Sequence, residues 1–199
     1  MAIKIQYNKT YLQLLQKQLK VRENALPTLQ AKESALRLEV KKAREELRDV
    51  EKRLADAQSA AAQANRLYRE LPRNALSVAG VDVDVRKIAG VKTPVFKGVR
   101  FTLADISLFV NAAWVPDGLE ALQAVAALTI ERGIAREKVK ILEYARKKTT
   151  QKVNLYEKVQ IPEYREALLK IKRFLEDEDN LAKSSQKILK ARIAMAEAA

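Results

Sequence analysis

The chain offers few side chains that could carry out chemistry. Its 199 residues include no cysteine and no histidine. That composition excludes thiol nucleophiles, disulfides, zinc fingers and imidazole acid–base catalysis, because each of these needs a residue type that the chain lacks. Any catalysis or metal binding would therefore depend on carboxylates alone. A chain without cysteine also fits a reducing compartment.

Two acidic segments are the candidates for such chemistry. Asp82 and Asp84 lie in an alternating Val-Asp-Val-Asp-Val segment, and residues i and i+2 of a strand share a face, so the two could hold one hard cation. No third carboxylate or Gly-rich loop follows, and we interpret them as the wet face of a half-buried strand. The run Glu176–Asp179 fans around a helix and does not converge.

Nucleotide chemistry is not expected either, because the chain has no Gly-x-x-x-x-Gly-Lys-Thr phosphate loop. The sequence thus predicts no catalytic residue, no metal site and no cofactor. The chain should be a structural or interaction protein rather than an enzyme.

The strong positive charge raises a second possibility. Lysine and arginine number 38 against 25 acidic residues, a net charge of +13. Basic patches bind nucleic acid, but here the charge is spread along the chain, and the longest basic run is Arg146–Lys148. A solvated rod, or a rod that lies against an acidic partner, accounts for the same charge. One interpretation of the charge is therefore a free-standing basic coiled-coil adaptor, with or without bound nucleic acid.

Targeting and membrane segments are not expected. The first residues contain no continuous apolar core of signal-peptide length, and the longest uncharged run is 106–116. A spanning helix needs about 20 mostly apolar residues. We therefore predict a soluble, intracellular protein.

Heptad spacing dominates the N-terminal part. Alternate steps of three and four from Ile5 to Leu71 pass through 20 positions, and all are apolar or tyrosine except Asn8, Arg22 and Glu33. So long a heptad pattern is typical of a coiled coil. Residues 1–71 are predicted to form one helix, with an alanine-rich seam at 55–64.

Glycine separates this helix from a second one. All five glycines fall between Gly80 and Gly133. Residues 118–199 are again helix-favouring, and 72–117 form a middle segment with two short β-rich stretches joined through Gly90, which predicts a hairpin. The expected fold is all-α dominated: a long antiparallel two-helix coiled coil with a small β-hairpin at one end, in one elongated domain.

An antiparallel pairing also predicts a register. If Leu71 lies opposite Leu119, then Pro27 and Pro162 lie at nearly the same level, where both helices should bend. In this register Ile5 lies opposite Ser185, so only about the last dozen residues would extend beyond the N-terminus.

The segment 149–162, TTQKVNLYEKVQIP, resembles the C-terminal motif of the D subunit of the V-type and archaeal-type rotary ATPases. The resemblance continues in order through Leu175–Glu178 and a Lys-rich tail, and in the middle through 88–94, IAGVKTP. Lys9-Thr10, Lys32–Ser34 and Tyr156 depart from the family pattern and suggest a divergent bacterial branch.

This resemblance implies a non-catalytic central rotor shaft that couples ATP hydrolysis or synthesis to ion transport, such as hydrogen ion transport. The implied partners are the catalytic A and nucleotide-binding B subunits of a hexamer, the F subunit, and a funnel-shaped subunit that leads to the membrane ring. At the rod tip we expect hexamer contacts by Lys4, Tyr7, Lys187, Lys190, Arg192, Ile193 and Met195. Near the hairpin we expect partner binding by Leu67, Tyr68, Leu71, Val85, Ile88, Val91, Phe96, Phe101 and Trp114.

Overall fold

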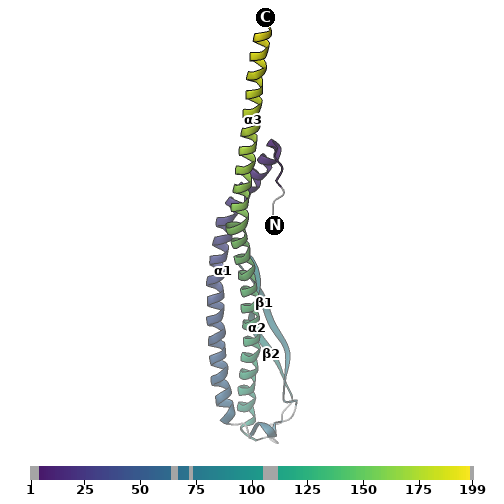
Figure 1. Ribbon diagram of the computed structural model, residues 1–199. Helices are drawn as coiled ribbons and strands as arrows, with labels where there is room; N and C mark the ends of the chain where they lie inside the picture. Colours follow the sequence, from purple (N-terminus) through teal and green to yellow (C-terminus); the bar gives the residue numbers. More distant parts are fainter. Residues whose placement is uncertain (1–4, 64–66, 72–73, 105–111, 198–199) are drawn as a thin grey trace. The chain divides into compact units, whose positions relative to one another are not determined.

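The computed structural model describes residues 5–63, 67–71, 74–104 and 112–197. In chain order the elements are α1 (Lys9–Gln63), η1 (Leu67–Glu70), β1 (Leu76–Ile88), β2 (Val91–Leu103), α2 (Val115–Asn154), η2 (Leu155–Gln160) and α3 (Ile161–Glu197) (Figure 1). The predicted helix-dominated fold with one small β-hairpin is confirmed. None of the helices in these described ranges is both long enough and apolar enough to cross a membrane.

Two compact units make up the chain. One combines residues 1–31 with 149–199, and the other comprises residues 32–148. Each unit contains a part of α1 packed antiparallel against a later helix. In the first unit Gln18 contacts Tyr164 and Arg22 contacts Gln160. In the second unit Arg53 pairs with Glu131 and Glu46 with Lys138.

Helix α1 is shorter than the predicted span of 1–71. It begins after Asn8, whose side-chain Oδ1 accepts a hydrogen bond of 2.6 Å from the backbone N–H of Tyr11. Asn8 is one of the polar exceptions in the heptad, and N-capping explains it. At the other end η1 is a separate 3-10 turn, so the apolar spacing of Tyr68 and Leu71 continues past the end of the helix.

A widened turn precedes Pro162. Residues 155–160 form a π-helix, and the backbone N–H of Ile161 bonds to the carbonyl of Tyr156, five residues earlier. Proline has no N–H and clashes with the carbonyl four residues before it, so a wider turn accommodates it without ending the helix. Pro27, by contrast, lies inside the uninterrupted α1.

The predicted register differs from the one observed in the first unit. With Ile5 opposite Ser185, Gln18 would face Lys172, but its partner is Tyr164. The difference is about two helical turns. Leu15 sets the observed register, because it is buried with Ala167, Leu168 and Ile171. The heptad pattern predicts that such a seam exists but not which layers meet.

The hairpin is longer than predicted. β1 and β2 pair antiparallel from Leu76 opposite Leu103 to Ile88 opposite Val91. The connecting residues Ala89 and Gly90 both have positive φ, 48° and 81°, the backbone of a two-residue hairpin turn. Its turn end packs on a core formed by Leu36, Val40, Ala43, Val139 and Leu142. The hairpin therefore runs along the helices of its unit and is anchored through its tip.

A third cluster closes the base of the same unit. Ala75, Val115 and Leu119 are buried there, with Leu71, Leu76 and Trp114 packed against them. The Trp114 ring lies edge-on to Tyr68 with centroids 6.1 Å apart. Gly118 makes this packing possible, because a Cβ at that position would lie 2.8 Å from the Trp114 ring.

Candidate functional site

Ion pairs cross between α1 and α2 on both sides of the apolar seam. In the unit of residues 32–148 these pairs are Arg44–Glu143, Arg53–Glu131, Arg136–Glu51 and Lys138–Glu46. Exposed pairs of this kind each contribute only about 0–1 kcal/mol. Their positions still matter, because sliding one helix past the other would break all four pairs. The arrangement favours one fixed register between the helices.

In the unit of residues 1–31 and 149–199, a cluster of polar side chains fixes the register between the helices. Arg22 donates to Gln160 at 2.9 Å and lies over the Tyr164 ring, 4.5 Å from its centroid. The Tyr164 hydroxyl donates to Gln18 at 2.8 Å. Arg22 is a polar exception in the heptad, and the sequence pattern predicts no role for it. Its partner Gln160 lies two residues before Pro162, within the motif that carries the family resemblance.

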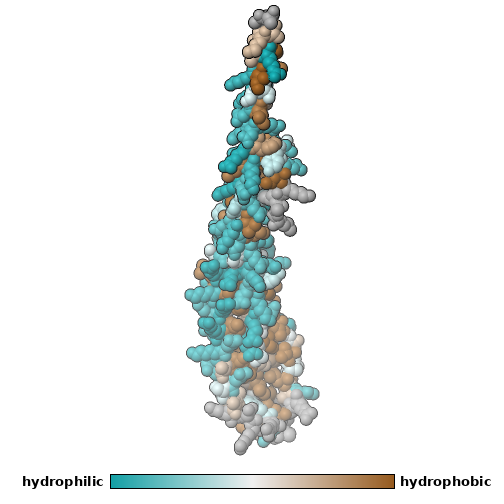
Figure 2. Space-filling model, viewed as in Figure 1, coloured by the Kyte–Doolittle hydropathy of each residue, from teal (hydrophilic) through white to brown (hydrophobic). Residues whose placement is uncertain are grey.

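The end of α3 is exposed along its whole length. Every described side chain from Glu176 to Ala196 is exposed, including large apolar ones. Met195 is 74% exposed and Ile193 49%. Figure 2 shows hydrophobic side chains among hydrophilic ones on this stretch of α3. The free end is therefore about three turns longer than the predicted dozen residues, because the core of its unit ends near Leu175.

The residues predicted for the rod tip are not all together. Lys187, Lys190, Arg192, Ile193 and Met195 share the exposed end of α3. Tyr7 instead lies against Phe174, well before that end, with ring centroids 4.8 Å apart and ring planes tilted by 48°. Lys4 lies outside the described residues.

Most residues predicted to bind a partner near the hairpin pack inside their own unit. Ile88 and Val91 lie against the core of α1 and α2, while Leu71 and Trp114 belong to the cluster at the base. Phe101 and Tyr68 are half-buried. Of the predicted set, only Leu67 and Val85 are exposed, at 40% and 62%.

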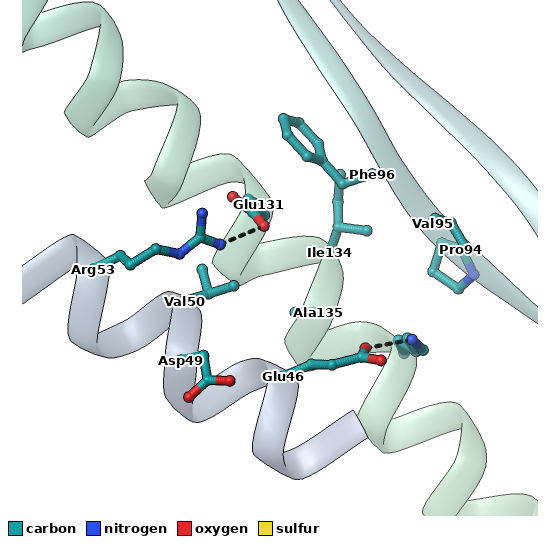
Figure 3. A pocket seen from close by; sticks show the side chains of 11 residues that line it. Glu46, Asp49, Val50, Arg53, Pro94, Val95, Phe96, Glu131, Ile134 and Ala135 are labelled. Carbon is teal, nitrogen blue, oxygen red and sulfur yellow. Dashed lines mark hydrogen bonds and ion pairs between the residues drawn. The ribbon is translucent and has the colours of Figure 1, made fainter. Parts of the chain in front are cut away.

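Phe96 lines a groove between β2 and the helices (Figure 3). The groove also includes Ile134 and Ala135 of α2 and Val50 of α1. Both cations of its rim are paired, Arg53 with Glu131 and Lys138 with Glu46. Phe96 thus fixes β2 to α2.

The outer strand carries an apolar strip that the sequence pattern does not reveal. Val78, Val81, Val83 and Val85 of β1 are all at least 39% exposed. The Val-Asp alternation predicts a half-buried strand, which is wrong because β2 rather than β1 faces the helices over this length. In Figure 2 hydrophobic surface gathers where Figure 1 places the hairpin. The sequence feature that could have indicated this exposed strip is the high valine content of β1, since a single hairpin has no second sheet to cover it.

The two aspartates of this strand each have a cation on β2. Asp82 pairs with Arg100 and Asp84 with Lys97, both at 3.1 Å. The pKa of Asp84 is lowered, first because its carboxylate accepts the Val85 N–H and then because of Lys97. Within the described ranges, no three acidic side chains come together in a way that could hold a metal ion.

Comparison with known proteins identifies a family. The profile of a family described as the D subunit of ATP synthase matches residues 11–191. Proteins named as D subunits of V-type ATP synthases are similar over most of both chains. The Chlamydia pneumoniae protein is 26% identical over 203 residues, which cover 100% of this chain and 97% of the relative. The Borreliella burgdorferi protein is 28% identical and covers 94% of each. The protein of Chlamydia trachomatis serovar L2 is 30% identical over 84% of this chain and 85% of the relative.

Proposed function

Since this chain belongs to the family of ATP synthase D subunits, we propose that it is the non-catalytic rotor shaft of a V-type ATPase. In this role it couples ATP hydrolysis or synthesis in the hexamer of A and B subunits to ion translocation by a membrane ring. Its place is the cytoplasmic face of the membrane, through the complex. The observation that carries the proposal is the antiparallel helix pairing, held in one register by buried layers and cross-helix contacts.

A shaft must transmit torque without its helices sliding. Leu36 and Leu142 are fully buried between α1 and α2, and the ion pairs around them resist displacement along the helix axes. Each catalytic interface would meet a different face of the shaft as it turns. Nucleotide affinity would then depend on rotation through differential contacts, as linkage requires.

The exposed end of α3 is the part we assign to the hexamer. Its apolar residues, such as Ile193 and Met195, would turn against the inner surface of the ring. Lys187, Lys190 and Arg192 would guide insertion by attraction to an acidic collar. The family resemblance, not the geometry, supplies the identity of this partner.

The outer strand of the hairpin is the surface we assign to the F subunit, with the funnel-shaped subunit beyond it. The exposed valines of β1 supply apolar area, and the free edge of a two-stranded sheet can pair with a partner strand. Of the residues predicted to bind a partner near the hairpin, Val85 lies on this exposed strand and keeps that proposed role. Ile88, Val91, Phe96 and Trp114 would act indirectly by holding the hairpin on the helices.

Co-purification from the native cell tests the role as a whole. An affinity-tagged chain should bring down A and B subunits in equal amounts, together with the F subunit. Recovery of nucleic acid or of an unrelated partner without the hexamer would support the basic adaptor instead. Treating the lysate with nuclease before purification separates direct partners from those bridged by nucleic acid.

Paired variants test the two surfaces separately. Val83→Lys with Val85→Lys should weaken binding of the F subunit while the hexamer still binds, because only β1 is changed. Leu181→Lys with Ile188→Lys on α3 is the matched control and should do the reverse. Deleting residues 81–100 should abolish binding of the F subunit, and normal binding by that deletion would overturn the assignment.

A further inference from the structure

A second groove on the unit of residues 32–148 differs in charge from the one in Figure 3. It is lined by Arg37, Val40, Lys41, Arg44, Glu45, Arg48 and Arg146, and we call it the cationic groove. Five of its seven lining residues are cations and one is a carboxylate. Over the whole chain the ratio is 38 to 25, so the net charge alone does not account for this concentration.

The cations of α1 form a regular row. Arg37, Lys41, Arg44 and Arg48 follow one another in steps of four, three and four residues, which places them on one face of the helix. At 1.5 Å per residue the row is about 17 Å long. Arg146 of α2 lies along the same groove.

Two of the five cations form ion pairs, and Glu45 is the one carboxylate in the groove. Arg37 pairs with Glu33, and Arg44 pairs with Glu143 of α2. Lys41, Arg48 and Arg146 have no ion pair with any residue that the structure describes. In the groove of Figure 3, by contrast, Arg53 and Lys138 each have a glutamate. Like charges held this close together repel one another, and a bound anion would relieve that repulsion.

We propose that the cationic groove binds an acidic α-helix of a partner protein. A helix lying along α1 with carboxylates at i, i+4, i+7 and i+11 would present them with the same spacing as the cations. Arginine forks favour carboxylates in two-point contacts. This inference goes beyond the rotor role and does not depend on it.

The test uses the full chain and synthetic peptides of about 20 residues, long enough to be helical. One alanine-rich peptide carries four glutamates at i, i+4, i+7 and i+11. Its control has the same composition with the glutamates distributed around the helix. Fluorescence anisotropy at low and at physiological salt should show about tenfold tighter binding of the first peptide, weakening as salt rises. Equal affinity for the two peptides would contradict the proposal.

Matched charge removal locates the site. Lys41→Gln, Arg48→Gln and Arg146→Gln together should weaken binding of the striped peptide about tenfold. Lys183→Gln, Lys187→Gln and Lys190→Gln on α3 remove the same charge and should change it less than about twofold. Equal losses would mean non-specific attraction to a basic chain and would overturn the proposal.

A charge swap keeps the test valid even if the triple variant is poorly folded. The single variant Arg48→Glu should lose affinity for the striped peptide and regain it when one glutamate of the peptide becomes lysine. Absence of rescue at every peptide position would count against the proposal. Inorganic tripolyphosphate is the competing ligand: tighter binding of it through the same three residues would assign the groove to phosphate instead of a helix.

Discussion

Large apolar side chains are buried between α1 and α2 but exposed at the end of α3. In the pair, Leu36 and Leu142 are completely buried. On α3, Leu181 and Met195 are 70% and 74% exposed. An amphipathic helix loses its apolar face from water only where a second helix lies against it. The pair therefore contains its own partner, whereas the end of α3 has a face that nothing in the described chain covers.

Substitutions in the core between α1 and α2 should cause the largest loss of stability. Leu142→Ala removes a fully buried side chain and should lower the free energy of unfolding by about 2–5 kcal/mol. Leu181→Ala on α3 should change it by less than about 0.5 kcal/mol. Urea denaturation followed by circular dichroism measures both. Similar losses for the two variants would show that the end of α3 is packed in solution.

Glycines provide the next test. Gly118→Ala should cost about 1–3 kcal/mol, because the added Cβ would meet the Trp114 ring. Gly133→Ala in the same helix meets nothing within 4 Å and should stabilise by about 0.5–1 kcal/mol. Fluorescence of the single tryptophan should shift only in the first variant. A stabilised Gly118→Ala would show that the aromatic packing at the base is loose.

Removal of the exposed end should affect assembly more than stability. A chain ending at Gln186 should unfold at nearly the same urea concentration, because the seam that holds α3 ends near Leu175. Binding to the hexamer should weaken, and fewer ions should be moved per ATP hydrolysed in reconstituted enzyme. Unchanged assembly together with an unchanged ion-to-ATP ratio would remove this end of α3 from the mechanism.

The smallest effect concerns Asp84 on the outer strand. Its pKa is lowered in the fold by the Val85 N–H and by Lys97, so the unfolded chain binds a proton more readily. The resulting stabilisation is present above the unfolded pKa and is lost as pH falls through the lower folded value, below about pH 4. Asp84→Asn should remove this acid dependence of hairpin chemical shifts, measured by NMR. An identical titration in the variant would mean that another carboxylate is responsible.

Much of the helix pair could be predicted from the heptad. Leu15, Leu36, Val40, Val50 and Leu54, all buried in α1, lie on the positions counted from Ile5. Residues 118–199 carry a less regular stripe at helical spacing, and it predicts burial correctly at Leu142, Leu168 and Ile171. It is wrong at Ala182, Ser185 and Leu189, which are exposed. An apolar stripe shows that a helix can pack against another, but the register decides which part of the stripe has a partner helix.

Three features could not be predicted because each depends on how distant segments pack or on a choice among equivalent local conformations. The π-helix before Pro162 is one of several ways to accommodate a proline, and the sequence does not select among them. The exposure of Val81 and Val83 follows from which strand of the hairpin lies against α2. The cationic groove needs Arg146 beside the row on α1, which only the observed register provides.

Rotation of the chain inside the hexamer is the central claim, and it can be observed directly. Because the chain has no cysteine, Lys92→Cys at the exposed turn end of β2 provides a single attachment point for a bead. With the hexamer fixed to a surface, addition of ATP should make the bead turn in one direction. A bead that stays still while the same complexes hydrolyse ATP would contradict the rotor-shaft account.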